Sequence, residues 1–295
     1  MLSESLRDRL RSLVLARRGA EPATDVRAGN GAPGAAAALA TRANGVAIDA
    51  DPVEAGVEAY LPGGEWRDAR GAVYVHERLR STVERPRDHW GRLELPPAEE
   101  DELCALASMG LGRALFLDLE TGGLAGSPVF LAGTMHWNGS DFVLRQYFAR
   151  HYGEEPTLLA AVSEQAAAFE VLVTFNGKSY DAPFLTSRAM VHRVSLRLPP
   201  RHLDLLHAAR RCWKRELADC RLQTLERYVC RRRRSGDVPS DEVPHLYHDY
   251  VRNGNAWRLV PVFHHNLLDV TTMAEILRAL CDPVPPRLPL GPLWA

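Results

Sequence analysis

The sequence predicts an α/β fold, built on a five-stranded mixed sheet that begins with three antiparallel strands and has helices on both faces. Two observations lead to this prediction. Three apolar stretches with the composition of strands follow one another between residues 114 and 148. After residue 154, helical segments alternate with short strand-like ones. The chain has 295 residues, 46% of them hydrophobic and 25% charged, which suits one large domain with an appendage.

Composition divides the chain into three parts. Residues 1–60 predict a short amphipathic helix and then a segment rich in Ala, Gly and Pro, which is typical of a linker or of disorder. Residues 61–111 are expected to pack on the main domain, where Ala72–Val75 would add an outer strand. The main domain is expected over residues 112–285.

The three antiparallel strands begin with residues 114–120, Ala-Leu-Phe-Leu-Asp-Leu-Glu, which end in the turn Thr121-Gly122-Gly123. The next two strands are expected over Val129–Trp137 and Phe142–Phe148. Between them stands Asn138-Gly139-Ser140-Asp141, a strong hairpin signal. This half of the sheet is therefore predicted to be antiparallel.

The second half of the sheet alternates with helices. Glu154–Phe169 has helical periodicity, and Val171–Phe175 is a short apolar strand. A helix follows from Asp181, where a nearby proline suits a first turn. A strand near His202–Leu205 leads into further helices, of which the last is expected over Asn266–Leu280.

Two carboxylates stand at the end of the first strand. Asp118 and Glu120 point to the same face because side chains alternate along a strand. Like charges this close repel each other unless cations are shared, and Mg²⁺ or Mn²⁺ with oxygen ligands are the obvious cations. Taken alone, such a pair is more often a solvated flank of a turn.

Two later motifs are also ordinary when taken alone. Asn176-Gly177-Lys178-Ser179-Tyr180-Asp181 follows a buried strand, and Asp181 could simply cap the next helix. In His264-His265-Asn266-Leu267-Leu268-Asp269, Asn266 could be the cap of the last helix and Asp269 an acid of its first turn. The order of the three motifs favours a functional interpretation instead: the first lies on the first strand, the second follows the fourth strand, and the third lies on the last helix.

Together, these motifs resemble the DEDD (DnaQ-like) 3′–5′ exonuclease superfamily, whose fold is ribonuclease-H-like, and within it the YprB-like group. The resemblance covers roughly residues 112 to 281. It rests on Phe116-Leu117-Asp118-Leu119-Glu120-Thr121, Val173-Thr174-Phe175-Asn176-Gly177-Lys178-Ser179-Tyr180-Asp181, His202-Leu203-Asp204-Leu205-Leu206 and His265-Asn266-Leu267-Leu268-Asp269. The set is specific as a whole, although each motif is weak by itself.

The resemblance implies that Asp118, Glu120, Asp181 and Asp269 bind two divalent metal ions, Mg²⁺ or Mn²⁺. It further implies a 3′–5′ exonuclease that hydrolyses phosphodiester bonds at single-stranded ends of DNA or RNA. Two rival functions stay open. One is a catalytically inactive nucleic-acid-binding or adaptor protein on the same fold, and the other is an endonuclease that uses the same metals. The presence of all four acids favours an enzyme.

The family usually adds a histidine or tyrosine that activates the attacking water, and two histidines compete for this role. His264 stands five residues before Asp269, the spacing of the histidine subclass, and His265 stands four before it, where the tyrosine subclass has its phenol. If the helix includes both, His265 lies about 40° from Asp269 around the helix axis and His264 about 140°. If the helix begins at Asn266, geometry does not decide between them.

Candidate substrate contacts flank the acids. In the resembling family, the turn after the first acids holds the terminal nucleotide, although a second threonine is usual where this chain has Gly122. Lys178 could reach a phosphate, and Tyr180 could stack on a base or pack in the core. The candidate substrate-binding residues are Thr121, Gly122, Leu124, Asn176, Lys178 and Tyr180.

Charge is clustered, although the net charge is only −1. Residues 201–234 hold eleven Lys or Arg against four acids, a local net of +7. Such a patch would bind phosphates without sequence preference, or it would be a solvated face of an arginine-rich protein. His245 and His248 have no second ligand pair at the spacing that zinc needs.

Cellular location is expected to be cytoplasmic, with no membrane association. The five cysteines are odd in number and contain no C-x-x-C pair. No stretch reaches the roughly 18 apolar residues that a membrane span needs. DNA or RNA preference, pathway and oligomeric state are not determined by the sequence.

Overall fold

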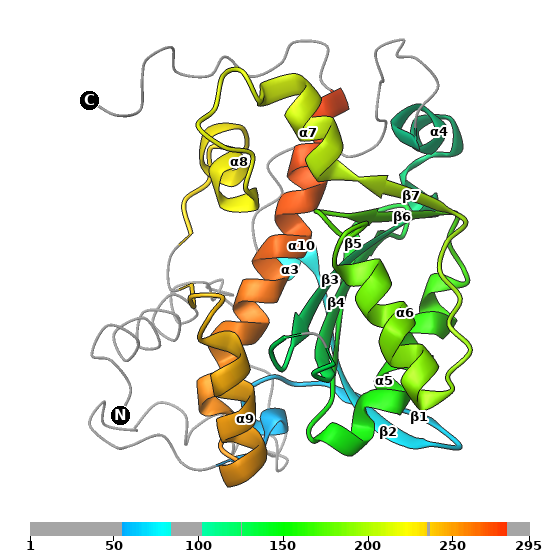
Figure 1. The fold of residues 1–295 in the computed structure, drawn as a ribbon, viewed down its shortest axis with the longest axis vertical. Coiled ribbons are helices and arrows are strands. Elements are labelled where there is room, and N and C mark those ends of the chain that lie inside the picture. The colour runs from blue at the N-terminus through cyan, green and yellow to red at the C-terminus, as the bar shows by residue number, and fades with distance from the viewer. Residues whose placement is uncertain (1–54, 84–101, 125, 235–236, 282–295) are drawn as a thin grey trace, which may run out of the picture.

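The computed structural model describes residues 55–83, 102–124, 126–234 and 237–281 (Figure 1). The predicted N-terminal amphipathic helix lies outside these residues, as does all of the linker except residues 55–60. Within residues 55–60, a short 3-10 helix, η1, spans Val57–Ala59, and Val57 is fully buried.

A seven-stranded mixed sheet, in the order β1-β2-β5-β4-β3-β6-β7, forms the centre of the described chain. The first five strands in this order pair antiparallel, and β6 and β7 continue the sheet in parallel with β3. The strands are β1 (Gly64–Asp68), β2 (Gly71–Leu79), β3 (Ala114–Thr121), β4 (Val129–Trp137), β5 (Phe142–Phe148), β6 (Val171–Thr174) and β7 (Arg201–Asp204).

The prediction of five strands is wrong, because β1 and β2 extend the sheet. β2 pairs along β5, which would otherwise be an edge strand with unpaired backbone groups. The outer strand expected at Ala72–Val75 lies within β2. The five remaining strands, β3 to β7, occur in the predicted chain order, and the first three of them are antiparallel as predicted. β4 and β5 also have the predicted bounds.

The helices of the described chain are α3 (Arg80–Val83), α4 (Glu102–Met109), α5 (Glu155–Ala166), α6 (Asp181–His192), α7 (Leu205–Trp213), α8 (Leu222–Tyr228), α9 (Val243–Asn253) and α10 (Val260–Cys281). Further 3-10 turns are η2 (Leu111–Arg113), η3 (Tyr152–Glu154) and η4 (Ala256–Leu259). No helix among the described residues is both long and apolar enough to cross a membrane.

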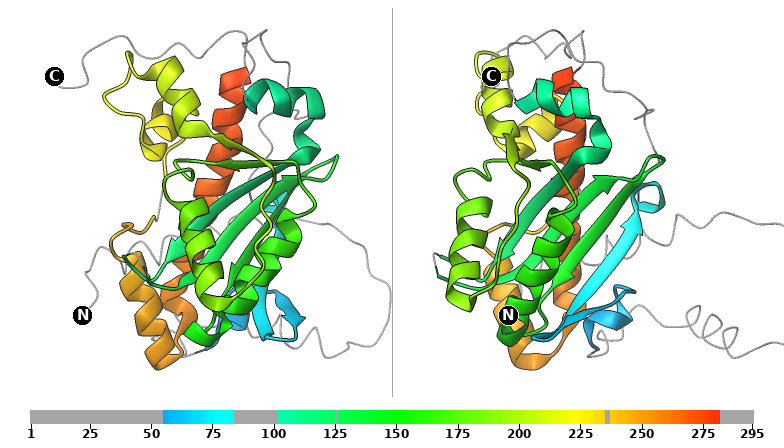
Figure 2. Two further views of the ribbon diagram at one scale, coloured as in Figure 1. Left: turned by 45° about the vertical axis from the view of Figure 1, so that its right-hand side comes forward. Right: turned by 90° about the vertical axis from the view of Figure 1, so that its right-hand side faces the viewer.

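Helices cover both faces of the sheet, as Figures 1 and 2 show. α10 crosses one face, and α5 and α6 lie on the other. Along β3 the side chains alternate between these layers: Phe116 packs in the cluster that contains α10, and Leu117 packs in the cluster of α5 and α6. The same alternation directs Asp118 and Glu120 toward α10.

The last helix begins earlier than predicted. α10 starts at Val260, six residues before Asn266, so Asn266 is an interior residue and the prediction of a helix cap is wrong. Asp269 is likewise not in the first turn. Pro261 stands in that first turn, where its missing N–H costs nothing. Most residues of α10 are buried, so apolar periodicity does not mark where it begins.

Candidate acidic active site

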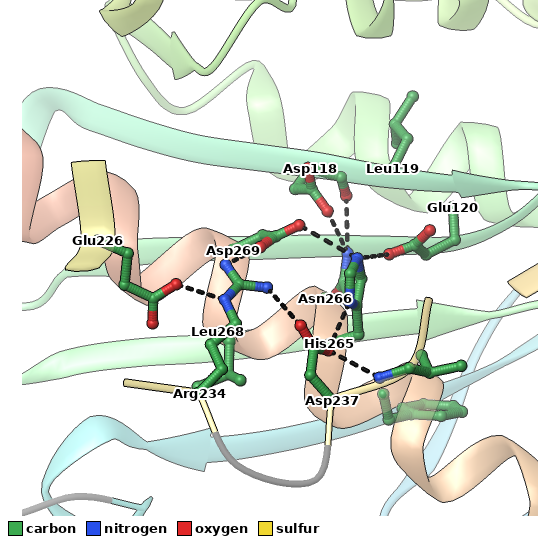
Figure 3. Close-up of polar contacts among 12 residues, drawn as sticks. Asp118, Leu119, Glu120, Glu226, Arg234, Asp237, His265, Asn266, Leu268 and Asp269 are labelled. Carbon is green, nitrogen blue, oxygen red and sulfur yellow. Dashed lines mark hydrogen bonds and ion pairs between the residues drawn. The ribbon is translucent and has the colours of Figure 1, made fainter. Parts of the chain in front are cut away.

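The four predicted acids meet where β3 ends beneath α10. Figure 3 shows three of them, Asp118, Glu120 and Asp269. Asp118 and Glu120 come from β3, and Asp269 comes from the middle of α10. Asp181 is the first residue of α6, and its Oδ1 accepts a hydrogen bond from the Leu119 backbone N–H at 3.1 Å. Asp181 therefore ties α6 to β3, and the interpretation of its side chain as a helix cap is wrong.

Burial and mutual repulsion disfavour the charged forms of Asp118, Glu120 and Asp181. Burial, and then the charges of its three partners, raise the pKa of Asp118 well above its usual range. The pKa of Glu120 is raised to about 8 and that of Asp181 to about 7, and burial is the largest cause of both shifts. Four half-buried oxygen-donor groups placed this close together are the donor set that hard divalent cations prefer. The chemistry of the residues thus fits Mg²⁺ or Mn²⁺.

Asn266 holds Asp118 in place, and the sequence did not identify it as part of the site. Its Nδ2 donates to the Asp118 carboxylate at 2.8 Å and to the Asp118 backbone carbonyl at 3.2 Å. Its Oδ1 accepts from Gln146 Nε2 at 3.0 Å. Gly133 on β4 makes room for this amide, since a Cβ at Gly133 would lie 2.0 Å from Asn266 Oδ1. A buried amide thus connects the first acid to the neighbouring strands.

His265 is the histidine that lies against the acids. Its Nε2 is 3.4 Å from Asp269 Oδ2 and 4.0 Å from Glu120 Oε1. Its Nδ1 lies 2.6 Å from Asp237 Oδ1. Burial alone would lower the pKa of His265, but the hydrogen bond to Asp237 and the surrounding carboxylates raise it to about 9.

His264 has a different environment. It precedes His265 in α10, and within the described chain it makes no hydrogen bond or ion pair with the four acids. Burial is the main cause that lowers its pKa to about 4. Because both histidines are helical, the 100° step between successive residues turns His264 away from the face that carries Asp269.

Arg234 brings a positive charge into the site, and the sequence singled it out only as one member of the basic patch. Its guanidinium forms ion pairs with Glu226, Asp237 and Asp269, as Figure 3 shows. As they stand, no three His, Cys, Asp or Glu side chains in the described ranges are arranged to hold a metal ion. A metal ion would compete with Arg234 for the Asp269 carboxylate.

The turn after β3 is held by α9. The Thr121 hydroxyl donates to the Gly123 carbonyl at 3.0 Å, and the Gly122 carbonyl lies 2.8 Å from His248 Nε2. A Cβ at Gly122 would lie 3.2 Å from the His248 ring, so this histidine takes space that a larger residue would need. Leu124 at the tip of the turn is 89% exposed and is therefore free to contact a ligand.

The other three substrate candidates lie in the turn between β6 and α6. Asp204 accepts hydrogen bonds from the backbone N–H groups of Asn176 at 2.8 Å and Lys178 at 3.1 Å. The Lys178 side chain borders a separate pocket of about 550 Å³ beside α6. Tyr180 is 68% exposed, so the interpretation that it packs in the core is wrong. Asp204 belongs to the motif His202-Leu203-Asp204-Leu205-Leu206, but no local pattern in the sequence indicates this structural role.

Comparisons with known proteins place the chain in a family. The family model described as the RNase_H superfamily matches residues 115–281. "Uncharacterized protein YprB" of Bacillus subtilis (strain 168) is 32% identical over 166 residues, which cover 55% of this chain and 40% of that protein. The chain thus spans less than half of this relative.

Two solved structures share a weaker likeness. The family B DNA polymerase from the hyperthermophilic archaeon Pyrobaculum calidifontis has a TM-score of 0.47 and 18% identity, covering 57% of this chain and 24% of that one. A nuclease in its apo form has a TM-score of 0.31 and 15% identity, and the match covers 56% of this chain and 84% of that one. Both TM-scores are too low to support a statement about this chain. The family match includes all four acids and more than half of the residues, so the chain belongs to the RNase_H superfamily and is a YprB-like protein.

Proposed function

We propose that this protein is a metal-dependent 3′–5′ exonuclease that hydrolyses phosphodiester bonds at single-stranded ends of DNA or RNA. The observation that carries the proposal is the convergence of four half-buried acids, Asp118, Glu120, Asp181 and Asp269, at the end of β3. Burying like charges together costs stability, so such a cluster is expected where cations are used in chemistry. The 3′–5′ direction and the single-stranded substrate rest on the resemblance of the four motifs to the exonuclease superfamily.

The four acids would hold two Mg²⁺ or Mn²⁺ ions. When bound, a pair of such ions activates the attacking water and stabilises the leaving oxygen. The protein prepares the ligands in advance: Asn266 orients the Asp118 carboxylate, and the Leu119 N–H orients that of Asp181.

We assign the general base to His265. Donation of its Nδ1–H to Asp237 fixes the ring and leaves Nε2 as the proton acceptor next to Asp269. The nearby carboxylate charges keep the pKa of His265 high, at about 9. Neutralising those charges would lower the pKa toward the range in which an imidazole accepts a proton at neutral pH.

A second function is favoured by one observation. Arg234 pairs with Asp269, so the protein partly neutralises the acidic cluster with its own side chain. A nucleic-acid-binding or adaptor protein that has lost catalysis would be stable with this arrangement. The retention of all four acids weighs against it, because no structural task requires them together.

The deciding experiment follows degradation of 3′-labelled and 5′-labelled single-stranded DNA and RNA with Mg²⁺ or Mn²⁺. Asp118→Asn keeps the size of the side chain and removes its charge. We expect the wild type to shorten strands stepwise from the 3′ end, and Asp118→Asn to be at least roughly a hundredfold slower. Binding without metal-dependent cleavage would support the adaptor, and internal cuts from the outset would indicate an endonuclease.

A further inference from the structure

A basic pocket of about 630 Å³ opens between α8 and the arginines that follow this helix. Ten residues line it, and four of them are arginines: Arg227, Arg232, Arg233 and Arg234. Glu226 and Asp237 are the acids of the lining, so the charged residues of the pocket sum to +2. Its volume lies in the range of about 300–1,000 Å³ that is usual for ligand sites.

Two of the four arginines pair with acidic or hydroxyl side chains of the protein itself. Arg234 forms ion pairs with Glu226, Asp237 and Asp269. Arg232 is buried, and its guanidinium lies 3.3 Å from the Thr271 hydroxyl and 3.7 Å from Glu275. These two side chains hold the wall of the pocket in shape.

The other two arginines point their charge outward. Arg227 and Arg233 are exposed, and neither forms an ion pair with an acid within the described ranges. The Arg227 guanidinium lies over the ring of Tyr228, 5.2 Å from its centroid. Tyr228 also lines the pocket and is half-buried. The opening therefore combines two available positive charges with an aromatic ring.

The pocket shares a wall with the acidic site. Arg234 lines the pocket and pairs with Asp269, and Asp237 lines it and lies 2.6 Å from the ring of His265. A ligand in the pocket would thus be one side chain away from the proposed reaction centre. Binding there would place an adjoining phosphate near the acids.

We propose that this pocket binds a single strand of nucleic acid next to the scissile bond, which rests on the proposed function. Arg227 and Arg233 bind its phosphates. Tyr228 packs against the hydrophobic core, and the ring face now beneath Arg227 becomes available to stack on a base when that guanidinium moves to a phosphate. Arginine and aromatic side chains together are typical of grooves that hold single strands. In a duplex the base faces are already stacked within the helix, so Tyr228 would find none to contact.

Fluorescence anisotropy with a labelled single-stranded oligonucleotide in EDTA tests this proposal on the full chain, because binding is then measured without cleavage. We expect Arg227→Ala and Arg233→Ala each to weaken binding and to reduce the slope of log K against log salt concentration by about 1. Arg221→Ala is the matched control. This exposed arginine immediately precedes α8, pairs with Asp219 and does not line the pocket, so the salt slope of Arg221→Ala should equal that of the wild type.

A duplex of the same sequence tests the stacking role. We expect Tyr228→Leu to weaken single-strand binding by roughly tenfold and to leave duplex binding unchanged. Unchanged slopes in both pocket variants, an equal loss in Arg221→Ala, or duplex binding as tight as that of the single strand would each overturn the proposal. If cleavage is never found, the binding arm still decides on the pocket. If cleavage is found but the salt slopes of Arg227→Ala and Arg233→Ala equal that of the wild type, the pocket proposal fails and the proposed exonuclease function stands.

Discussion

Arg234 lies among three carboxylates and has only 9% of its side chain exposed. Its partners are also poorly exposed, with 1% of Glu226, 15% of Asp269 and 16% of Asp237 accessible. Removing one member of a buried ion pair leaves the other charge without compensation. The guanidinium is therefore expected to be the main counter-charge of this side of the site when metal is removed.

Arg234→Gln should lower the free energy of unfolding by about 3–5 kcal/mol in EDTA, measured by urea denaturation. Arg221→Gln breaks a solvent-exposed pair with Asp219 and should cost less than about 1 kcal/mol. Saturating Mg²⁺ should restore part of the loss in Arg234→Gln, since a bound cation would neutralise Asp269. Equal losses in the two variants would contradict this account of the cluster.

Asn266→Ala should destabilise the protein by about 1–3 kcal/mol, because it leaves the buried Gln146 amide and the Asp118 carboxylate without their shared partner. Thermal or urea unfolding measures the effect. Ser108→Ala is a suitable control, since this exposed hydroxyl bonds only to the Ala105 carbonyl in its own helix. A loss for Asn266→Ala no larger than that of the control would show that the amide contributes little.

The packing of α10 on β4 depends on a close approach between helix and strand. Gly133 faces Asn266, and β4 pairs Gly133 with Asp118 on β3. The strand therefore needs a residue without a side chain at the position where the helix places its buried amide. The arrangement of the acids thus depends on a contact between two elements and not only on the acids themselves.

Gly133→Ala should cost about 1–3 kcal/mol of stability, because its Cβ would overlap the Asn266 amide. Gly112→Ala is the matched control, since its Cβ would meet nothing closer than 3.7 Å. In an Asn266→Ala background the obstacle is gone, so Gly133→Ala should then cost clearly less. A double-mutant cycle with no coupling between the two positions would refute the proposed contact.

Across the whole molecule, the acidic site lies between two hydrophobic clusters that α10 joins. Phe263 belongs to the cluster with β5 and α9, and Leu267 and Val270 belong to the cluster with α7 and α8. The His265–Asp269 segment is therefore packed by apolar side chains from both directions along the helix. This packing is the physical source of the desolvation that raises the pKa values of the acids.

Stability in EDTA should fall as the pH rises from about 6.5 to 9. Below pH 6.5 the lowered pKa values of His136, His202 and His264 oppose the fall. The folded-state pKa values of Glu120, Asp181 and His265 are raised to about 8, 7 and 9. The unfolded chain releases these protons at about pH 4–6.5, whereas the folded protein keeps them to higher pH. The stabilisation that comes from binding these protons is complete below the unfolded-state pKa values. It is lost as the pH rises through the folded-state pKa values.

Melting temperatures at pH 6.5, 7.5 and 9 with EDTA and with Mg²⁺ would check this dependence. Mg²⁺ should flatten it, because a cation replaces the protons on the acids. Glu120→Gln removes one of the groups and should show a smaller fall in EDTA. A melting temperature that rises between pH 6.5 and 9 in EDTA would contradict the assigned directions.

Much of the main sheet could be predicted from the sequence, since strand alternation, turns and short motifs are local properties. The bounds of β4 and β5 follow from their apolar runs and the hairpin between them. Alternation alone places Asp118 and Glu120 on one face. β1 and the start of α10 were not predicted. β1 is largely exposed, and most residues of α10 are buried, so neither shows a clear alternation of apolar and polar residues.

Only the tertiary structure decided what surrounds the acids. Asp237, Arg234 and Asn266 lie 28, 35 and 148 residues from the partners they contact in the site. Local sequence patterns do not predict contacts between residues so far apart in the chain, since these contacts depend on how α10 and the segment after α8 pack on the sheet. The sequence thus determined the family, the order of the elements and the set of acids. The fold decided their charge state, their counter-charges and which histidine accompanies them, because desolvation and electrostatic pairing act through space and not along the chain.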